Sequence, residues 1–544
     1  DGASSHTVTI DAKDKDDKVE VTLKDVNIDA SSRSEAAVSV TGKGDTTIEL
    51  DGDNELKSGA GHAGLEHNKT DTSGELTIQD KDKNGSLEAA GGFKGAGIGS
   101  AGSNDAQVKI TGGNITATSD DWGAGIGSGS YGTGTVEITG GEINATGGYL
   151  GAGIGGGCNG SGNVTISGGT ITAAGGDGAA GIGGGYYNGA TVTITGDAVI
   201  KNASTTVYGA GIGGGNGYDG DVTISGNAKI ENATGGYGAA GIGGCAFSSP
   251  DKIGNGNVVI KDNAKIDNVQ GGAYGAGIGG GIYGLSNVTI EGNTKVNATG
   301  GAGGAAIGGG AGAENNSDNN GNQITIKSNE NGSPTINAVG GGTDEGEEIV
   351  IGGAGIGAGC ESDADADITL EGKVTITATA GKDNVAIGAN GIEQEFSGLA
   401  EGSSITRYDS ECNDTSLPGD KVPVTPVVPD DTSSGGSADA SVQESVFPGL
   451  VVTDKDGQRI SYTSIRGNNV LSIRVGRFTA SLRASLATLR QLRAEGIDTI
   501  TFQTILCSTT LSVDKLLAMG GEDTEVVLTH HIRSSTLTVG GKAV

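Results

Sequence analysis

One short segment, Gly-Ala-Gly-Ile-Gly, recurs along about half of the chain with small variations. The first four copies lie 28 residues apart, and later copies are spaced more widely. Self-similarity at such a period is the sequence signature of a solenoid, whose units are stable only when they stack on one another. The isoleucine of the segment falls at Ile98, Ile126, Ile154, Ile182, Ile212, Ile242, Ile278, Ile307, Ile356 and Ile387.

Each unit carries two further segments in which apolar and polar residues alternate, such as Val164–Ile166 and Ile171–Ala173. Alternation places the first and third residues on one face, as in a β-strand with one face in the core. Three such strands per unit predict a mainly β fold. We expect a right-handed parallel β-helix, or solenoid, of about 11 three-strand coils plus a small C-terminal α+β module.

Glycine is abundant and proline is not, with 107 and 7 residues. Collagen requires both on a strict period of three and is therefore excluded. Glycine pairs between the strands predict corners, because glycine enters the positive-φ region at little cost. Within the recurring segment we expect Gly95, Gly97 and Gly99 to face outward and to leave a flat, open groove.

The flanking segments differ from the repeats. We expect residues 1–90 to form an N-terminal cap with irregular coils and residues 91–395 to form the regular repeats. Residues 396–446 are expected to contain the end of the cap and then a linker rich in Pro, Thr, Ser and Asp. Residues 447–544 predict the α+β accessory module, with a second short helix after Ser512. Its first helix is predicted from an apolar stripe that ends before Gly496 and consists of Leu482, Leu486, Leu489 and Leu492.

The charge is strongly negative, at −32. Nucleic acid is excluded as a ligand because phosphate binding requires many Lys and Arg side chains. No apolar run is long enough to span a membrane. The five cysteines lack the spacing of a zinc site or a disulfide framework. The chain opens without the pattern of a signal peptide, which fits a processed or trimmed chain, so export is an inference.

Twelve aromatic residues lie between positions 93 and 283, all within six residues of a repeat isoleucine. They predict two banks of rings beside the glycine strand, which suits sugar binding because pyranose C–H faces pack on aromatic rings. The alternative is an aromatic ladder that only shields a core of small residues, and exposure distinguishes the two. Phe93, Trp122, Tyr149, Tyr208, Tyr237 and Tyr274 precede the strand, whereas Tyr131, Tyr186, Tyr187, Tyr218, Phe247 and Tyr283 follow it.

Two aspartates are candidates for a hydrolytic pair. Asp121 precedes Trp122, and Asp177 holds the matching place two coils later, which predicts a separation of about 10 Å, near the upper end for an inverting pair. Asp219 and Asp221 lie on the other bank. Aspartates in glycine-rich turns also serve turn geometry, which is the alternative.

Histidine and arginine are absent from the repeats: no Arg lies between Arg33 and Arg407, and no His between His67 and His530. A lyase that uses a basic side chain, and a Ser or Cys nucleophile that needs a histidine base, are therefore disfavoured.

Calcium is the one cofactor that the sequence suggests. Asp80, Asp82, Asn84 and Glu88 resemble the start of a calcium loop, although Gly91 stands where a bidentate Glu is expected. A solvated turn is the alternative.

The motif GAGIGGG followed by VTISGGTITA resembles the glycine-rich repeats of secreted and wall-attached proteins of Gram-positive bacteria, with a pectin-lyase-like right-handed parallel β-helix. The resemblance covers residues 90–395. It implies this fold and a secreted or cell-surface location. It implies no particular activity, because the architecture serves lyases, hydrolases, adhesins and glycan-binding modules.

Three functions follow as hypotheses. The leading one is an extracellular carbohydrate-binding or adhesive β-helix that recognises a neutral polysaccharide or host glycan along the glycine strand, flanked by the aromatic residues. The second is a glycoside hydrolase that uses Asp121 and Asp177. The third is a structural stalk or an adhesin with a protein partner.

Overall fold

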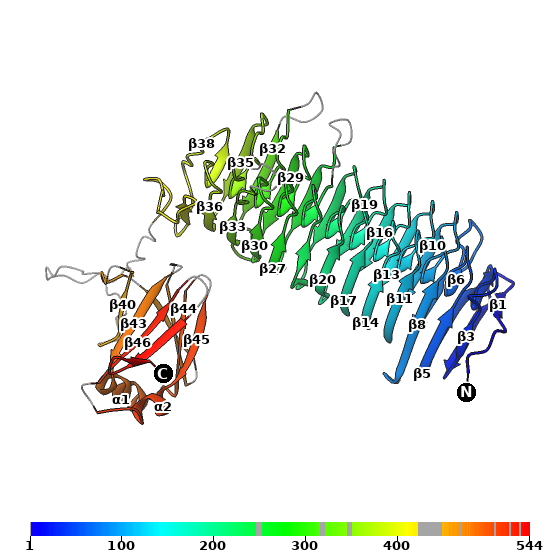
Figure 1. Cartoon of the computed structure of the whole chain (residues 1–544), viewed down its shortest axis with the longest axis horizontal. Coiled ribbons are helices and arrows are strands. Elements are labelled where there is room, and N and C mark those ends of the chain that lie inside the picture. The colour runs from blue at the N-terminus through cyan, green and yellow to red at the C-terminus, as the bar shows by residue number, and fades with distance from the viewer. Residues whose placement is uncertain are drawn as a thin grey trace, which may run out of the picture. The chain divides into compact units, whose positions relative to one another are not determined.

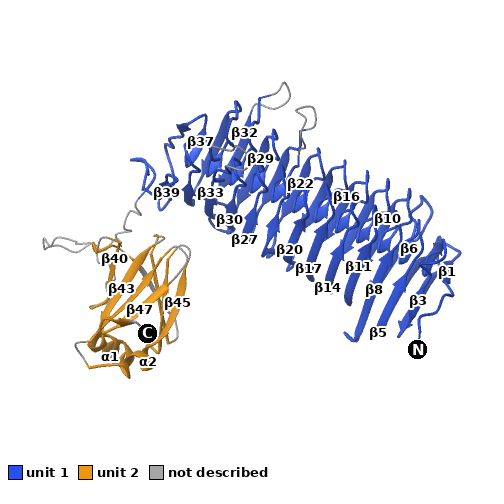
Figure 2. Ribbon diagram, in the orientation of Figure 1, with its two compact units in different colours: residues 1–427 blue, residues 428–544 orange. Residues whose placement is uncertain are grey.

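The structure is a computed structural model that describes residues 2–245, 253–315, 321–344, 351–422 and 449–543, without 456, 461, 468, 476, 478, 505–506, 522–523 and 532–534. The chain forms two compact units, residues 1–427 and 428–544 (Figure 2). Unit 1 is a stack of coils in which strands from successive coils lie side by side (Figure 1). Over its described residues, unit 2 contains two small sheets and two short helices.

The strands of unit 1 form three ladders in which neighbouring coils pair in parallel. The first ladder contains β2 (Lys18–Lys24), β5 (Asp45–Lys57), β7 (Leu76–Gln79), β10 (Ala106–Ile110), β13 (Gly134–Ile138), β16 (Gly162–Ile166), β19 (Ala190–Ile194), β22 (Gly220–Ile224), β26 (Gly256–Ile260), β29 (Ser286–Glu291), β32 (Asn322–Lys327) and β35 (Ala366–Glu371). The second contains β3 (Asn27–Asp29), the later half of β5, β8 (Gly85–Gly91), β11 (Asn114–Ser119), β14 (Glu142–Thr146), β17 (Thr170–Gly175), β20 (Val199–Thr205), β23 (Lys229–Ile230), β24 (Ala233–Thr234), β27 (Lys265–Gln270), β30 (Lys295–Thr299), β33 (Thr335–Val339), β36 (Thr375–Thr379) and β39 (Ser404–Tyr408).

The third ladder holds the recurring segment, whose strands are mostly two residues long. It contains β1 (Val8–Ala12), β4 (Val38–Gly42), β6 (Leu65–His67), β9 (Ile98–Gly99), β12 (Ile126–Gly127), β15 (Ile154–Gly155), β18 (Ile182–Gly183), β21 (Ile212–Gly213), β25 (Ile242–Gly243), β28 (Ile278–Gly279), β31 (Ile307–Gly308), β34 (Ile356–Gly357), β37 (Ile387–Ala389) and β38 (Ile392–Glu393). Over the described residues, all of these strands pair in parallel except β38, which is antiparallel to β37. The ladder has more strands than the expected eleven coils, because β1 and β4 join it in register before β6, and β38 pairs at its other end.

The alternation predicted from the sequence is confirmed. Val136 pairs with Val164 and Ile154 pairs with Ile182 in the next coil, and these side chains are all buried. Each coil thus places the same apolar residues above those of the previous coil, and one continuous core fills the stack. The corners between the first and second ladders contain glycine at positive φ, as in Gly113 (φ 103°) and Gly141 (φ 97°), which is the conformation that glycine adopts at low cost.

The C-terminal end of the stack is closed by a carboxylate. In earlier coils the N–H groups of Gly97 and Ile98 donate to carbonyl oxygens of the next coil. At the last coil the equivalent N–H groups of Ala386 and Ile387 donate to the two oxygens of Glu393, at 2.7 and 3.2 Å. Glu393 therefore replaces the carbonyl groups of a coil that does not follow.

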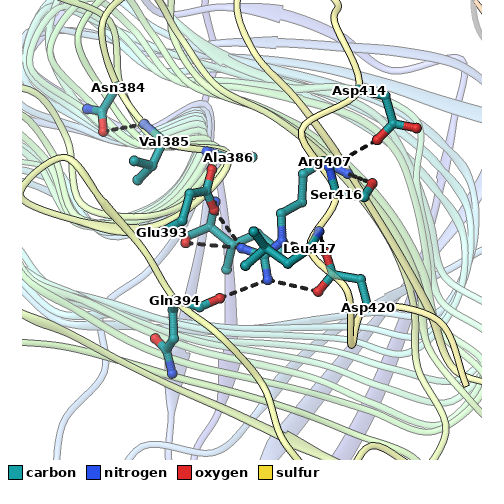
Figure 3. Close-up of polar contacts among 11 residues, drawn as sticks. Asn384, Val385, Ala386, Glu393, Gln394, Arg407, Asp414, Ser416, Leu417 and Asp420 are labelled. Atoms are coloured by element: carbon teal, nitrogen blue, oxygen red, sulfur yellow. Dashed lines mark hydrogen bonds and ion pairs between the residues drawn. The ribbon is translucent and has the colours of Figure 1, made fainter.

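A buried arginine holds this carboxylate in place (Figure 3). Arg407 on β39 is fully buried and donates to Glu393 (2.5 Å), to both oxygens of Asp420 (2.8 and 3.1 Å) and to the carbonyl oxygen of Gln394 (2.8 Å). This network is the terminal cap of unit 1.

Unit 2 pairs β40 (Val451–Thr453), β43 (Ala480–Ser485), β46 (Glu525–His530), β47 (Ser535–Val539) and β48 (Lys542–Ala543) in one sheet, and β41 (Thr463–Gly467), β42 (Val470–Arg474), β44 (Thr499–Gln503) and β45 (Ser508–Ser512) in the other. Its helices are α1 (Leu486–Ala494) and α2 (Val513–Leu517). None of the described helices is long and apolar enough to cross a membrane.

One element of unit 2 differs from its prediction. Leu482 belongs to β43 and not to the first helix. The Ser485 hydroxyl accepts the N–H of Thr488 and caps α1, so the helix begins after it. The second helix follows Ser512 as predicted, and the Ser512 hydroxyl accepts from Lys515 in the same way.

Candidate functional site: the loop ridge

Two loops flank each short strand of the third ladder, and they meet across neighbouring coils. The Ser130 N–H donates to the carbonyl oxygen of Lys94 (2.9 Å), and one coil later the Cys158 N–H donates to that of Trp122 (2.7 Å). The loop after a strand is therefore bonded to the loop before the preceding strand. We call the loops that flank strands β9 to β31 the loop ridge.

The glycine strand is not the open groove expected from the sequence. Gly95, Gly97 and Gly99 are all buried. A Cβ atom on Gly97 would lie 2.6 Å from the carbonyl oxygen of Gly125 and 2.7 Å from the backbone nitrogen of Thr118. The missing side chains thus let the chain pack on its own backbone, and no space remains for a ligand. The two predicted aromatic banks share one ridge and do not face each other across a groove.

The aromatic side chains of the ridge lie outside the core. None of the eleven that the structure describes is buried; Phe247 lies outside the described residues. Tyr131 and Tyr149 are 57% and 59% exposed. Phe93, Tyr187 and Tyr237 are also exposed, whereas Trp122, Tyr186, Tyr208, Tyr218, Tyr274 and Tyr283 are partly exposed.

Several rings contact one another from coil to coil. Tyr237 lies edge to face with Tyr208 and Tyr274, at centroid distances of 6.0 and 5.5 Å. Phe93 and Trp122 are 5.2 Å apart, and the Lys94 Nζ atom lies 5.3 and 5.0 Å from their centroids. These contacts stabilise the ridge. Contact between neighbouring coils is therefore one role of these rings.

Four tyrosines of the ridge occupy a backbone conformation that favours glycine. Tyr131, Tyr187 and Tyr283 stand fifth after their repeat isoleucine, with φ of 66°, 61° and 61°. Other coils place Gly217 and Gly312 there, with φ of 81° and 67°. The fourth is Tyr274 (φ 69°), before its strand. A bulky residue in this region costs on the order of 1 kcal/mol or more relative to glycine, so the turn alone does not account for the tyrosines.

A groove lies on each side of the ridge. The larger, about 570 Å³, is bounded by the loop around Tyr218 and by the first residues of β16, β19 and β22, including Asn163 and Asp221. The smaller, about 490 Å³, lies beside the second ladder and includes Phe93 and Asp120. Ligand sites in proteins are concavities of this size that combine apolar and polar groups.

The predicted catalytic pair lies beside one tyrosine. The Tyr149 hydroxyl donates to Asp177 Oδ2 at 3.0 Å. This hydrogen bond and the negative charges of Asp177 and Asp121 raise the pKa of Tyr149. Asp177 Oδ1 is buried, without a hydrogen-bond partner among the described residues. The pair thus shares one neighbourhood, and its catalytic role stays a prediction.

In the predicted calcium loop, the carboxylate of Asp80 accepts hydrogen bonds from the backbone of its own turn. Asp80 accepts the N–H groups of Asn84 and Gly85 at 3.2 and 3.0 Å, which stabilises its own turn. Asp82 and Glu88 are exposed. Within the described ranges, no three His, Cys, Asp or Glu side chains come together to hold a metal ion. Calcium binding at these residues stays a prediction.

A family model described as Beta helix repeat matches residues 108–130, 136–158, 164–186 and 222–245. The solenoid is a β-helix. The matched segments run from the first ladder into the ridge, and they include Trp122, Tyr149, Tyr186 and Tyr237. No curated protein and no solved structure matches the chain.

Sequence reasoning missed two features of the site. The first is the larger groove, whose polar side chains Asn163 and Thr191 come from neighbouring coils in register. The second is the set of tyrosines at positive φ. Its signal is present in the sequence, because tyrosine and glycine replace each other at the fifth position after the repeat isoleucine.

Proposed function

We propose that this protein is an extracellular carbohydrate-binding or adhesive β-helix that binds neutral glycan with the aromatic side chains of the loop ridge. The observation that carries the proposal is the retention of Tyr131, Tyr187, Tyr274 and Tyr283 at positive φ. Backbone strain of this kind persists where the side chain has a use. An exposed ring that packs on the C–H face of a sugar is such a use.

The repetition of the ridge supports a polymeric ligand. Successive coils are about 4.8 Å apart, so rings of neighbouring coils can contact one glycan chain together. Weak contacts that act on the same chain reinforce one another. The charge supports a neutral ligand: residues 1–446 contain 23 Lys and Arg against 58 Asp and Glu, a net −35. An acidic glycan would be repelled.

A binding assay with glycine substitutions tests the proposal. Affinity electrophoresis in gels that contain mannan, dextran or galactan measures the retardation of the full chain. Tyr131→Gly and Tyr187→Gly remove the rings and relieve the strain, so we expect lost retardation with unchanged folding. Ser103→Gly and Asn159→Gly change the same position of the loop, where φ is 66° and 57°, without removing a ring. Equal retardation of all four variants would refute the proposal.

A glycoside hydrolase is the second candidate. It is favoured by the buried Oδ1 of Asp177, which has no hydrogen-bond partner in the part of the chain that the structure describes, and by the proximity of Asp121, which contributes to the raised pKa of Tyr149. Two carboxylates at one site are the minimum for hydrolysis. Release of reducing ends from a neutral polysaccharide, abolished by Asp177→Asn, would support this function. No release from a broad panel would exclude it.

A further inference from the structure

We propose that the larger groove beside the ridge is a subsite for one neutral pyranose unit, bound through its hydroxyl groups by Asp219 and Asp221 and through its C–H face by Tyr218. This inference rests on the proposed glycan-binding function and names the place and ligand chemistry of one contact. The groove measures about 570 Å³, which is enough for one or two sugar units.

The floor of the groove is a row of side chains in register. Asn163 pairs with Thr191, and Thr191 pairs with Asp221, on the neighbouring strands β16, β19 and β22. All three positions point outward and are exposed. Amide, hydroxyl and carboxylate groups are therefore presented about 4.8 Å apart.

Among the described residues, the two carboxylates accept hydrogen bonds from one neighbouring coil. Asp219 Oδ1 accepts the N–H of Asn255 at 2.7 Å, and Asp221 Oδ1 accepts the side-chain amide of Asn257 at 2.7 Å. Both partners belong to the next coil, and neither is a cation. The remaining oxygens can accept hydrogen bonds from sugar hydroxyls, and such bonds to charged acceptors are the strong ones.

A third polar group is fixed in the wall. The Asn188 side chain donates to the carbonyl oxygen of Asn159 (3.2 Å) and accepts the N–H of Gly189 (3.0 Å). Its orientation is thus set before a ligand arrives, and a preorganised group lowers the entropic cost of binding.

The charge of the groove selects against acidic sugars. Its described residues include two aspartates and no Lys or Arg. Burial raises the pKa of Asp219, and the neighbouring charge of Asp221 raises it further. A uronate or sulfated unit would add a further negative charge there. A metal ion is disfavoured as the occupant, because no three ligating side chains converge among the described residues.

The test compares neutral and acidic oligosaccharides on the full chain. Isothermal titration calorimetry with manno-, gluco- and galacto-oligosaccharides, and with oligogalacturonate, gives the affinities. We expect a neutral series to bind and oligogalacturonate not to bind.

Asp221→Asn keeps the shape of the side chain but removes the charged acceptor, and it should weaken binding of the neutral oligosaccharide about tenfold. Tyr218→Ala should weaken it similarly. Asn287→Ala, which changes the same outward row two coils beyond Asp221, should have no effect.

The outcomes separate the two proposals. If the wild type binds, Tyr131→Gly abolishes binding, and both groove variants bind like the wild type, the groove is not a subsite but the ridge still binds glycan. If the wild type binds no neutral oligosaccharide and no neutral polysaccharide, both proposals fail. Binding that is lost with EDTA and restored by Ca²⁺ would overturn direct recognition by the carboxylates.

Discussion

The terminal cap predicts where unit 1 begins to unfold. Replacing Arg407 with Leu removes the cation that pairs with both Glu393 and Asp420. Asp420 is 2% exposed, so its charge would stay buried and unpaired. Breaking a buried ion pair in this way costs about 3–5 kcal/mol. The Glu393 carboxylate would also lose its anchor, and with it the N–H groups of Ala386 and Ile387 would lose their acceptors.

The loss should be local. Each coil of a solenoid contacts only its neighbours, so stability is lost from the end that is disturbed. A cost of about 4 kcal/mol corresponds to about a thousandfold rise in the opening equilibrium of the last coil. Hydrogen exchange followed by mass spectrometry measures this in peptides that cover residues 384–395, while peptides that cover β12 should keep the exchange of the wild type.

A surface ion pair of unit 1 provides the control. Lys109 and Glu137 lie 3.0 Å apart on the exposed side of the first ladder, and such pairs contribute about 0–1 kcal/mol. Lys109→Met should leave exchange in residues 384–395 unchanged. If Arg407→Leu leaves Ala386 and Ile387 as protected as in the wild type, the capping role of Glu393 and Arg407 is wrong.

Two further predictions concern the ridge. Gly127→Ala places a Cβ atom 2.0 Å from the carbonyl oxygen of Gly155 at φ 134°, whereas Gly61→Ala has open space at φ 90°. In urea unfolding, the free energy of unfolding should fall by several kcal/mol for the first variant and by about 1 kcal/mol for the second. Equal losses would contradict the close packing of the glycine strand. Asp177→Asn removes the charge that favours the protonated phenol of Tyr149, so the pKa of Tyr149 should fall. A difference titration of tyrosine absorbance at alkaline pH, variant against wild type, measures this change. An unchanged titration curve would contradict the hydrogen bond between Tyr149 and Asp177.

The fold could be predicted from the sequence because its determinants are local. The alternation in Val164–Ile166 gives the direction of each side chain relative to the core, and the spacing of the isoleucines gives the stacking. The covering of the glycine strand could not be predicted in the same way. It depends on the close approach of Gly97 to Gly125 in the next coil and to Thr118 on the second ladder, and residues so far apart in the sequence are brought together only by the folded stack.

Unit 2 shows a different limit. Leu482 fits the helical spacing of Leu486 and Leu489, but the residues around it also alternate with a period of two. Two periodicities overlap in one short segment, and the Ser485 cap decides between them. The position of a helix start therefore needed the hydrogen bond and not only the apolar pattern.

The central claim is that the tyrosines of the loop ridge contact the glycan, and oxidative footprinting of the full chain tests it most directly. The protein is oxidised by hydroxyl radicals with and without a neutral polysaccharide that it binds, and each side chain is followed by mass spectrometry. We predict that oxidation of Tyr131 and Tyr149 falls on binding, while Met519 in unit 2, 46% exposed, is unchanged. Binding that leaves both tyrosines as reactive as before would contradict the claim.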